Sequence, residues 1–73
     1  MALPLVSGEE VCRALMRAGF SRKSQSGSHV KMRHADGRNA VVPLHKELAQ
    51  GTLRSILKQA AVTAEEFEKL LAG

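Results

Sequence analysis

The sequence predicts an α+β domain in which a helix, a three-stranded antiparallel sheet, a second helix and a short C-terminal helix follow one another. Three observations carry this prediction: a capping box at Ser7, strict apolar–polar alternation over 29–34, and the hairpin pair Asp36-Gly37 directly after it. The chain has 73 residues, and we expect a single small domain over 1–73.

The first helix is expected to begin after Ser7 and to end at Gly19. The Ser7 hydroxyl can accept from the third helical N–H while Glu10 reaches back to the backbone of Ser7, which is a capping box. Apolar residues then recur at helical spacing, at Val11, Leu15 and Ala18, with Cys12 and Met16 widening the stripe. Gly19 is suited to end the helix because glycine adopts left-handed backbone angles without strain.

The next segments are expected to be strands. We predict a first strand over 20–25, a connection at 26–28 and a second strand over 29–34. Successive side chains of a strand point to opposite faces, so Val30 and Met32 face the core. The other face of the second strand carries His29, Lys31 and Arg33.

Asp36-Gly37 is typical of a two-residue hairpin loop, and it sets the expected register of the third strand. The expected pairs are His34 with Asn39, Met32 with Val41 and Val30 with Pro43. In this register Ala40 and Val42 share the open face of the sheet, where they would form the apolar centre of a protein interface. Helices on one face leave that other face exposed to solvent.

Two helices are expected after the sheet. Gly51-Thr52 is interpreted as the cap of the first, whose buried stripe is Leu53, Ile56, Leu57 and Ala60. Thr63 and Glu66 form a second capping box. It opens a short helix that carries Phe67, Leu70 and Leu71.

The charge is concentrated in the middle of the chain. The formal net charge is +4, and ten of the eleven lysines and arginines lie between Arg13 and Lys58. Only Asp36 and Glu47 oppose them there. This pattern indicates a polyanionic partner, although a solvated basic surface explains the composition equally well.

The composition also indicates where the protein acts. No apolar run is long enough to span a bilayer, and the N-terminal segment lacks the basic flank and length of a signal peptide. The lone Cys12 has no partner for an internal disulfide and is expected to be a packed thiol. We therefore expect a cytoplasmic protein without a membrane contact.

The ordered motifs resemble the HicA-type toxins, also described as YcfA-like proteins, which are small bacterial mRNA interferases. The matching residues are Ala18-Gly19-Phe20, Gly27-Ser28-His29, Asp36-Gly37-Arg38, Val42-Pro43-Leu44-His45, the segment Gly51-Thr52-Leu53-Arg54-Ser55-Ile56-Leu57-Lys58-Gln59-Ala60, and Glu66-Phe67. They run in this order through nearly the whole chain. The element order is also that of the double-stranded-RNA-binding domain.

The resemblance implies an RNA-cleaving toxin that a HicB-type antitoxin holds inactive by covering its active site. It also implies that His29, the histidine of the Gly-Ser-His motif, is catalytic. The residues expected to bind the mRNA substrate are Gly27, Ser28, Lys31, Arg33 and Arg38. Gly27 and Ser28 are equally interpretable as turn residues, and His34, on the predicted core face, as structural.

The residues allow a metal-free mechanism. RNA supplies its own nucleophile, the 2′-hydroxyl, and histidine can act as base or acid near neutral pH. The carboxylates of Asp36 and Glu47 show no paired spacing for a metal ion, so no metal or other cofactor is expected. Cleavage needs a second proton transfer, for which Lys31, water and His45 are all open.

Two other functions stay compatible with the sequence. The first is a non-catalytic RNA-binding module of double-stranded-RNA-binding type, which shares the fold and charge without needing His29. The second is a protein-interaction domain whose basic face meets only an acidic partner. An RNA cleavage assay on a His29→Ala variant separates these alternatives.

Overall fold

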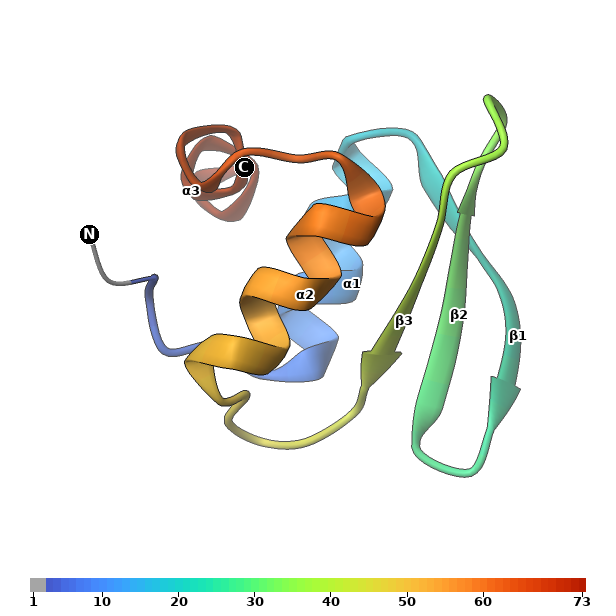
Figure 1. Ribbon diagram of the computed structural model, residues 1–73, viewed down its shortest axis with the longest axis horizontal. Coiled ribbons are helices and arrows are strands. Elements are labelled where there is room, and N and C mark those ends of the chain that lie inside the picture. Colours follow the sequence, from blue (N-terminus) through green and yellow to red (C-terminus); the bar gives the residue numbers. More distant parts are fainter. Residues whose placement is uncertain (1–2) are drawn as a thin grey trace.

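The computed structural model describes residues 3–73, which form three helices and three strands (Figure 1). The elements are α1 (Gly8–Arg17), β1 (Phe20–Ser26), β2 (His29–His34), β3 (Asn39–Pro43), α2 (Gln50–Ala60) and α3 (Ala64–Ala72). Helix, three strands and helix is the order of the double-stranded-RNA-binding domain, and α3 is the added short helix. The predicted fold class is confirmed.

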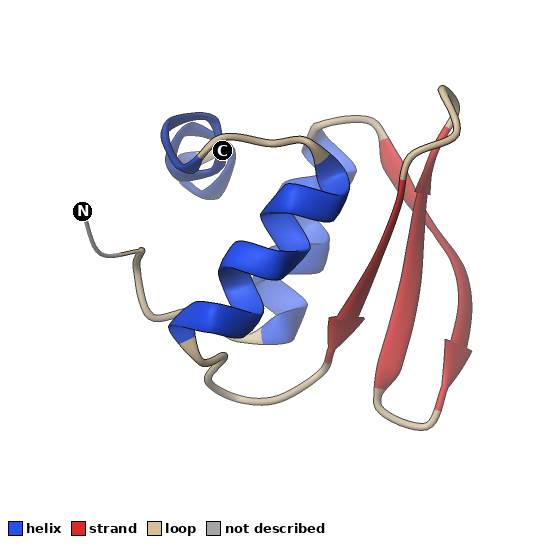
Figure 2. Ribbon diagram, viewed as in Figure 1, coloured by secondary structure: helices blue, strands red, loops and turns tan. Residues whose placement is uncertain are grey.

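The helices lie on one side of the three strands, as Figure 2 shows. Helix α1 packs on β1 and β3, α2 packs along β3, and α3 packs on α1. The core between these layers is apolar. Its fully buried large side chains include Val11, Leu15, Val30, Met32, Val42, Leu53 and Phe67. No helix of the described residues covers the opposite face of the sheet, and most side chains that point there are exposed.

Helix α1 begins and ends as its sequence predicts. The Glu10 N–H donates to the Ser7 hydroxyl at 3.1 Å, and the Ser7 N–H donates to the Glu10 carboxylate at 2.9 Å. Gly19 follows the helix with a φ of +98°, in the region that favours glycine. A Cβ at Gly19 would lie 2.8 Å from Nε2 of His34, so glycine is needed there for space as well.

Strands β1 and β2 form a hairpin closed by Gly27 and Ser28. Ser26 pairs with His29, which leaves two residues in the turn, and Gly27 has a φ of +58°. Glycine with positive φ at the first central position is typical of a type II′ hairpin turn. The register shifts between Arg22 and Ser24, so one extra residue forms a bulge in β1.

The register of β2 on β3 differs from the prediction by one residue. The loop between these strands is closed by the His34 N–H, which donates to the Arg38 carbonyl at 2.9 Å, and the Gly37 N–H donates to the His34 carbonyl at 2.9 Å. Gly37 has a φ of +99°. This is a three-residue loop, a turn followed by a glycine bulge, instead of the two-residue loop that Asp36-Gly37 suggested.

The corrected register reverses the faces of β3. The observed pairs are His29 with Pro43, Val30 with Val42, Lys31 with Val41, Met32 with Ala40 and Arg33 with Asn39. Ala40 and Val42 are therefore fully buried against the helices, and the prediction that they lie on the open face is wrong. Val41, expected in the core, is 42% exposed on the open face instead.

Helix α2 begins earlier than predicted and covers the β3 edge of the sheet. Its N-cap is Ala49, which makes no side-chain cap, so the prediction that Gly51-Thr52 caps the helix is wrong. The Gln59 side chain accepts a hydrogen bond from the Val41 N–H at 3.0 Å. This contact occupies a backbone donor that an edge strand would otherwise expose.

The C-terminal helix is fixed at both ends. Thr63 and Glu66 form the predicted capping box, and Phe67 is fully buried. The Arg17 guanidinium donates to the Leu70 carbonyl at 2.8 Å, which joins the end of α1 to α3. The predicted burial of Phe67 is confirmed, and Leu70 and Leu71 are partly buried against the core.

Cys12 is packed inside the helix layer, as predicted. Its burial raises the pKa of the thiol, and the nearby Arg22 guanidinium opposes that shift only in part. A thiol held in its neutral form is a poor nucleophile. None of the helices in residues 3–73 combines the length and apolarity that a membrane crossing requires.

Candidate active site

Three polar side chains of β2 form an exposed row on the open face of the sheet. His29, Lys31 and Arg33 are exposed, while Val30 and Met32 between them are fully buried. The alternation follows from the two-residue period of a strand, and it was predicted from the sequence. We call the face that carries this row the basic face.

The neighbours of the row on β1 and β3 are small or uncharged. Directly paired residues of an antiparallel sheet lie on the same face. The β1 partners of His29, Lys31 and Arg33 are Ser26, Ser24 and Ser21, and their β3 partners are Pro43, Val41 and Asn39. No carboxylate belongs to this set. The row therefore presents its positive charge among short or uncharged side chains.

Lys31 and Arg33 are free to bind an anion. Neither side chain makes an ion pair or a hydrogen bond to another residue of the described range 3–73. Arg22 differs from both. It pairs with buried Met32 on the helix side of the sheet, and its guanidinium is bound to the Glu9 carboxylate of α1. A phosphate brought to the basic face would therefore meet two cations that need not first break a contact.

The Gly27-Ser28 turn adjoins His29 at the end of the hairpin. A Cβ placed on Gly27 would find no atom within 4 Å, so the backbone there is open to solvent. The Ser28 carbonyl accepts from the Leu44 N–H at 2.6 Å, and the Gln25 amide donates to the Gly27 carbonyl at 2.9 Å. These bonds support the turn interpretation of both residues and leave their expected contact with RNA a prediction.

His45 lies beside His29. The centroids of the two imidazole rings are 6.5 Å apart, and the ring planes are inclined by 73°. Both side chains are exposed. The sequence left His45 as one of several candidates for a second proton transfer, and the structure brings it to the same end of the sheet as His29.

Arg38 lies on the helix side of the sheet, away from the basic face. Its guanidinium donates to the Asp36 carboxylate at 2.8 Å and to the Ala60 carbonyl, and it stacks over the Phe20 ring at 5.1 Å. Arg38 therefore lies apart from Lys31 and Arg33, and its expected contact with RNA stays a prediction. The cause is the three-residue loop, which puts Arg38 on the same side as buried Ala40.

His34 is a structural histidine, as the sequence suggested. Its ring packs edge-on against Phe20 at 5.1 Å, and its Nδ1 lies 3.2 Å from the Asp36 carboxylate and accepts from the Asp36 N–H at 3.1 Å. The hydrogen bond from the Arg38 N–H holds the pKa of Asp36 below its usual range. These contacts fix the far end of the β2–β3 hairpin.

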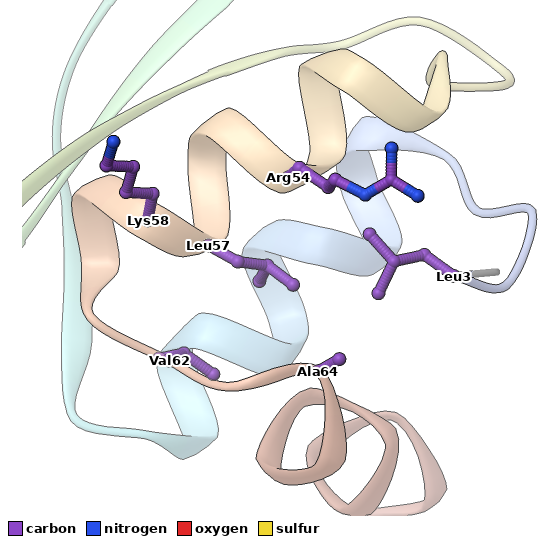
Figure 3. A pocket seen from close by; sticks show the side chains of 6 residues that line it. All are labelled: Leu3, Arg54, Leu57, Lys58, Val62 and Ala64. Carbon is purple, nitrogen blue, oxygen red and sulfur yellow. The ribbon is translucent and has the colours of Figure 1, made fainter. Parts of the chain in front are cut away.

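The apolar pocket in Figure 3 is separate from the basic face. It has a volume of about 270 Å³ and is lined by Leu3, Arg54, Leu57, Lys58, Val62 and Ala64, all on the helix side of the sheet. Its polar groups are two cations, without an acid or a histidine. Across residues 3–73, no group of three or more histidine, cysteine or acidic side chains is placed to hold a metal ion.

A comparison with protein-family models agrees with these features of the site. Residues 8–62 match the family model described as "HicA toxin of bacterial toxin-antitoxin". This chain belongs to the HicA toxin family. A search of curated proteins found no match.

The HicA match covers the whole sheet and both helices that pack on it. It begins at the first residue of α1 and ends just after α2, so it contains His29, Lys31, Arg33 and His45 and excludes α3. Membership in the HicA family makes this chain the toxin of a toxin–antitoxin pair. An antitoxin partner follows from that role.

Proposed function

We propose that this HicA toxin is a metal-independent endoribonuclease that cleaves mRNA in the cytoplasm, with His29 as a catalytic proton-transfer group. One observation carries the proposal: an exposed histidine stands on an open sheet face beside two cations that pair with no acid in residues 3–73. An anionic substrate is favoured there, and imidazole exchanges protons near neutral pH.

The proposed reaction uses a nucleophile that RNA already contains. A base takes the proton of the 2′-hydroxyl, the 2′-oxygen attacks phosphorus, the bond from phosphorus to the 5′-oxygen breaks, and an acid protonates that oxygen. The products are a 2′,3′-cyclic phosphate and a 5′-hydroxyl end. Lys31 and Arg33 would hold the phosphate and stabilise the charge that develops on its oxygens.

Recognition is expected to rely on the RNA backbone. The two phenylalanines are the only aromatic residues of the sequence apart from histidine, and both are buried, so they cannot stack on bases. The open backbone at Gly27 allows a phosphate or a 2′-hydroxyl to approach closely. These features support weak sequence preference.

The test is cleavage of an end-labelled RNA by the purified toxin in EDTA. We expect 2′,3′-cyclic phosphate and 5′-hydroxyl ends, and no cut at a position that carries a 2′-deoxy sugar. His29→Ala should lower the rate by about 10²–10⁴-fold, the usual contribution of general acid–base catalysis. Ser24→Ala is the matched control, since Ser24 is exposed and paired with Lys31 on the same face.

Three results would overturn the proposal. Full activity of a folded His29→Ala variant would remove the residue from catalysis. Inhibition by EDTA that added metal reverses would show a metal-dependent nuclease. Binding of RNA by the wild type without cleavage would instead indicate a non-catalytic RNA-binding module.

We also propose that the antitoxin is of HicB type and inhibits by covering His29. The catalytic face is open and has no lid within the described residues, so control must come from a bound partner. An antitoxin surface that is acidic opposite Lys31 and Arg33 would complement the basic face. Val41, 42% exposed and paired with Lys31, supplies an apolar contact in the middle of that face.

Occlusion predicts that RNA and antitoxin exclude each other. A pre-formed toxin–antitoxin complex should neither bind nor cut RNA. Added antitoxin should displace the His29→Ala toxin from labelled RNA. A stable ternary complex with RNA seated at His29 would rule out occlusion.

A further inference from the structure

The imidazole of His45 lies beside that of His29, and strand pairing explains its position. His29 pairs with Pro43, so the two residues share the basic face. His45 lies two residues beyond Pro43, and in an extended chain this spacing returns a side chain to the same face. His45, just beyond the end of β3, is therefore a diagonal neighbour of His29, and their ring centroids lie 6.5 Å apart.

The segment that carries His45 is held on both sides. The Leu44 N–H donates to the Ser28 carbonyl at 2.6 Å, which extends the pairing with the turn before His29. The Gly8 N–H, at the start of α1, donates to the His45 carbonyl at 2.9 Å. A Cβ on Gly8 would lie 2.0 Å from the Pro43 carbonyl oxygen, so the helix end packs directly against this segment. The position of His45 is thus set by backbone contacts that do not use its imidazole.

We propose that His45 is the second catalytic residue and that His29 and His45 act as an acid–base pair on one phosphodiester. The inference rests on the proposed ribonuclease activity. One imidazole takes the 2′-hydroxyl proton, the 2′-oxygen bonds to phosphorus as the bond to the 5′-oxygen breaks, and the other imidazolium donates its proton to that 5′-oxygen. No water is consumed, and the two rings finish with their protonation exchanged. Solvent then restores it.

The distance between the two rings suits one ring acting as the base and the other as the acid. Each catalytic hydrogen bond spans about 3 Å, so two facing rings must leave space for the reacting oxygens between them. Rings 6.5 Å apart are too far for a direct hydrogen bond and near enough to reach one bound phosphate from two sides. Both are exposed, so the space is accessible to RNA.

The other candidates fit the second proton transfer less well. His34 lies at the opposite end of β2, on the helix side, and its ring is engaged by Phe20 and Asp36. A lysine ammonium ordinarily keeps its proton far above neutral pH, which makes Lys31 better suited to hold the phosphate than to exchange protons.

The charged groups around the pair come from four segments. They are Lys31 on β2, Lys23 at the bulge of β1, Lys46 and Glu47 directly after His45, and Glu9 on α1, which is paired with Arg22.

The test compares wild type, His29→Ala and His45→Ala by the dependence of kcat/KM on pH, with Ser24→Ala as control. We expect a bell-shaped profile for the wild type, a fall of about 10²–10⁴-fold for His45→Ala, and the loss of one limb of the bell in each histidine variant. His45→Gln should behave like His45→Ala, because an amide keeps polarity but does not titrate. Thermal unfolding checks that each variant is folded.

An RNA with sulfur in place of the scissile 5′-oxygen assigns the roles, since a thiolate leaves without protonation. We expect this substrate to rescue one histidine variant, the one that lacks the acid, and not the other. Rescue of neither variant would overturn the pair. So would His45→Ala with near-wild-type rates, or with a lower rate and both limbs intact, which would make His45 a positioning residue. In each case loss of activity in His29→Ala alone would leave the proposed ribonuclease standing.

Discussion

The two ends of β2 each carry a histidine, and the two imidazoles have opposite surroundings. His29 begins the strand, is exposed, and has another imidazole, that of His45, as its ring neighbour. His34 ends the strand, is half-buried, and is held by Phe20 and Asp36. The same residue type is available for chemistry at one end and used for packing at the other.

Strand parity causes this difference. His29 and His34 are separated by an odd number of positions, so they point to opposite faces of the sheet. One face is open and basic, and the other is covered by the helices. A histidine thus acquires its role from the face on which it lies, and the same rule separates exposed Lys31 from Arg38, which is bound to the helix layer.

The largest effect expected is a crossed result for the two histidines. His29→Ala should lower RNA cleavage by about 10²–10⁴-fold and leave the free energy of unfolding nearly unchanged. His34→Ala should leave cleavage nearly unchanged and lower stability by about 1 kcal/mol, because it removes an edge-on aromatic contact. Cleavage rates and urea unfolding of both variants measure this. Equal effects of the two substitutions on cleavage would contradict the assignment of His29 to catalysis and His34 to packing.

The glycines beside the two histidines provide the second comparison. Gly19→Ala and Gly27→Ala each place a side chain at positive φ, which costs about 1–2 kcal/mol. The new Cβ at position 19 would also press on His34 at 2.8 Å, whereas position 27 has open space. Gly19→Ala should therefore be the more destabilising in urea unfolding. Adding His34→Ala should recover part of the loss, and no recovery would contradict the contact.

The third comparison is between the basic face, with Lys31 and Arg33, and the cationic pocket on the helix side, with Arg54. Lys31→Ala and Arg33→Ala should each weaken RNA binding and lower the slope of log affinity against log salt by roughly one unit or less, the effect of one lost phosphate contact. Arg54→Ala is the matched control, since Arg54 lines the pocket on the helix side. Binding titrations at several salt concentrations test this. A lower slope for Arg54→Ala alone would move the RNA to the helix side.

The smallest effect is expected at Asp36, in the structural loop. Its pKa is lowered in the folded state, mainly by the Arg38 N–H, so the carboxylate stabilises the fold above its unfolded pKa of about 3.9. This contribution is lost as pH falls through the lower folded pKa. Asp36→Asn should be slightly less stable at pH 7, with the gap in Tm shrinking at pH 3. A gap that grows in acid would refute this sign.

The sequence alone was sufficient to predict the order of helices and strands and the exposed row of His29, Lys31 and Arg33. Local signals decided both: the capping boxes at Ser7 and Thr63 were found in the structure, and the alternation of 29–34 placed three polar side chains on one face. Such signals depend on neighbours within a few residues. They therefore survive without knowledge of the tertiary structure.

The register of β3 required more than local signals. An Asp-Gly pair fits a two-residue loop and also a three-residue loop with a glycine bulge, and the two differ by one position of pairing. Choosing the shorter loop exposed Ala40 and Val42 and placed Arg38 on the basic face. Burial of Ala40 and Val42 by the helices favours the longer loop.

The most direct test of the account is to watch all three imidazoles as RNA binds. Two-dimensional NMR of the ring nitrogens of His29, His34 and His45 can be recorded while a 2′-deoxy-substituted, uncleavable RNA is added. We predict that the signals of His29 and His45 move together and saturate with binding, while His34 stays in place. Movement of His34 with His29 unperturbed would contradict the assignment of the basic face as the RNA site.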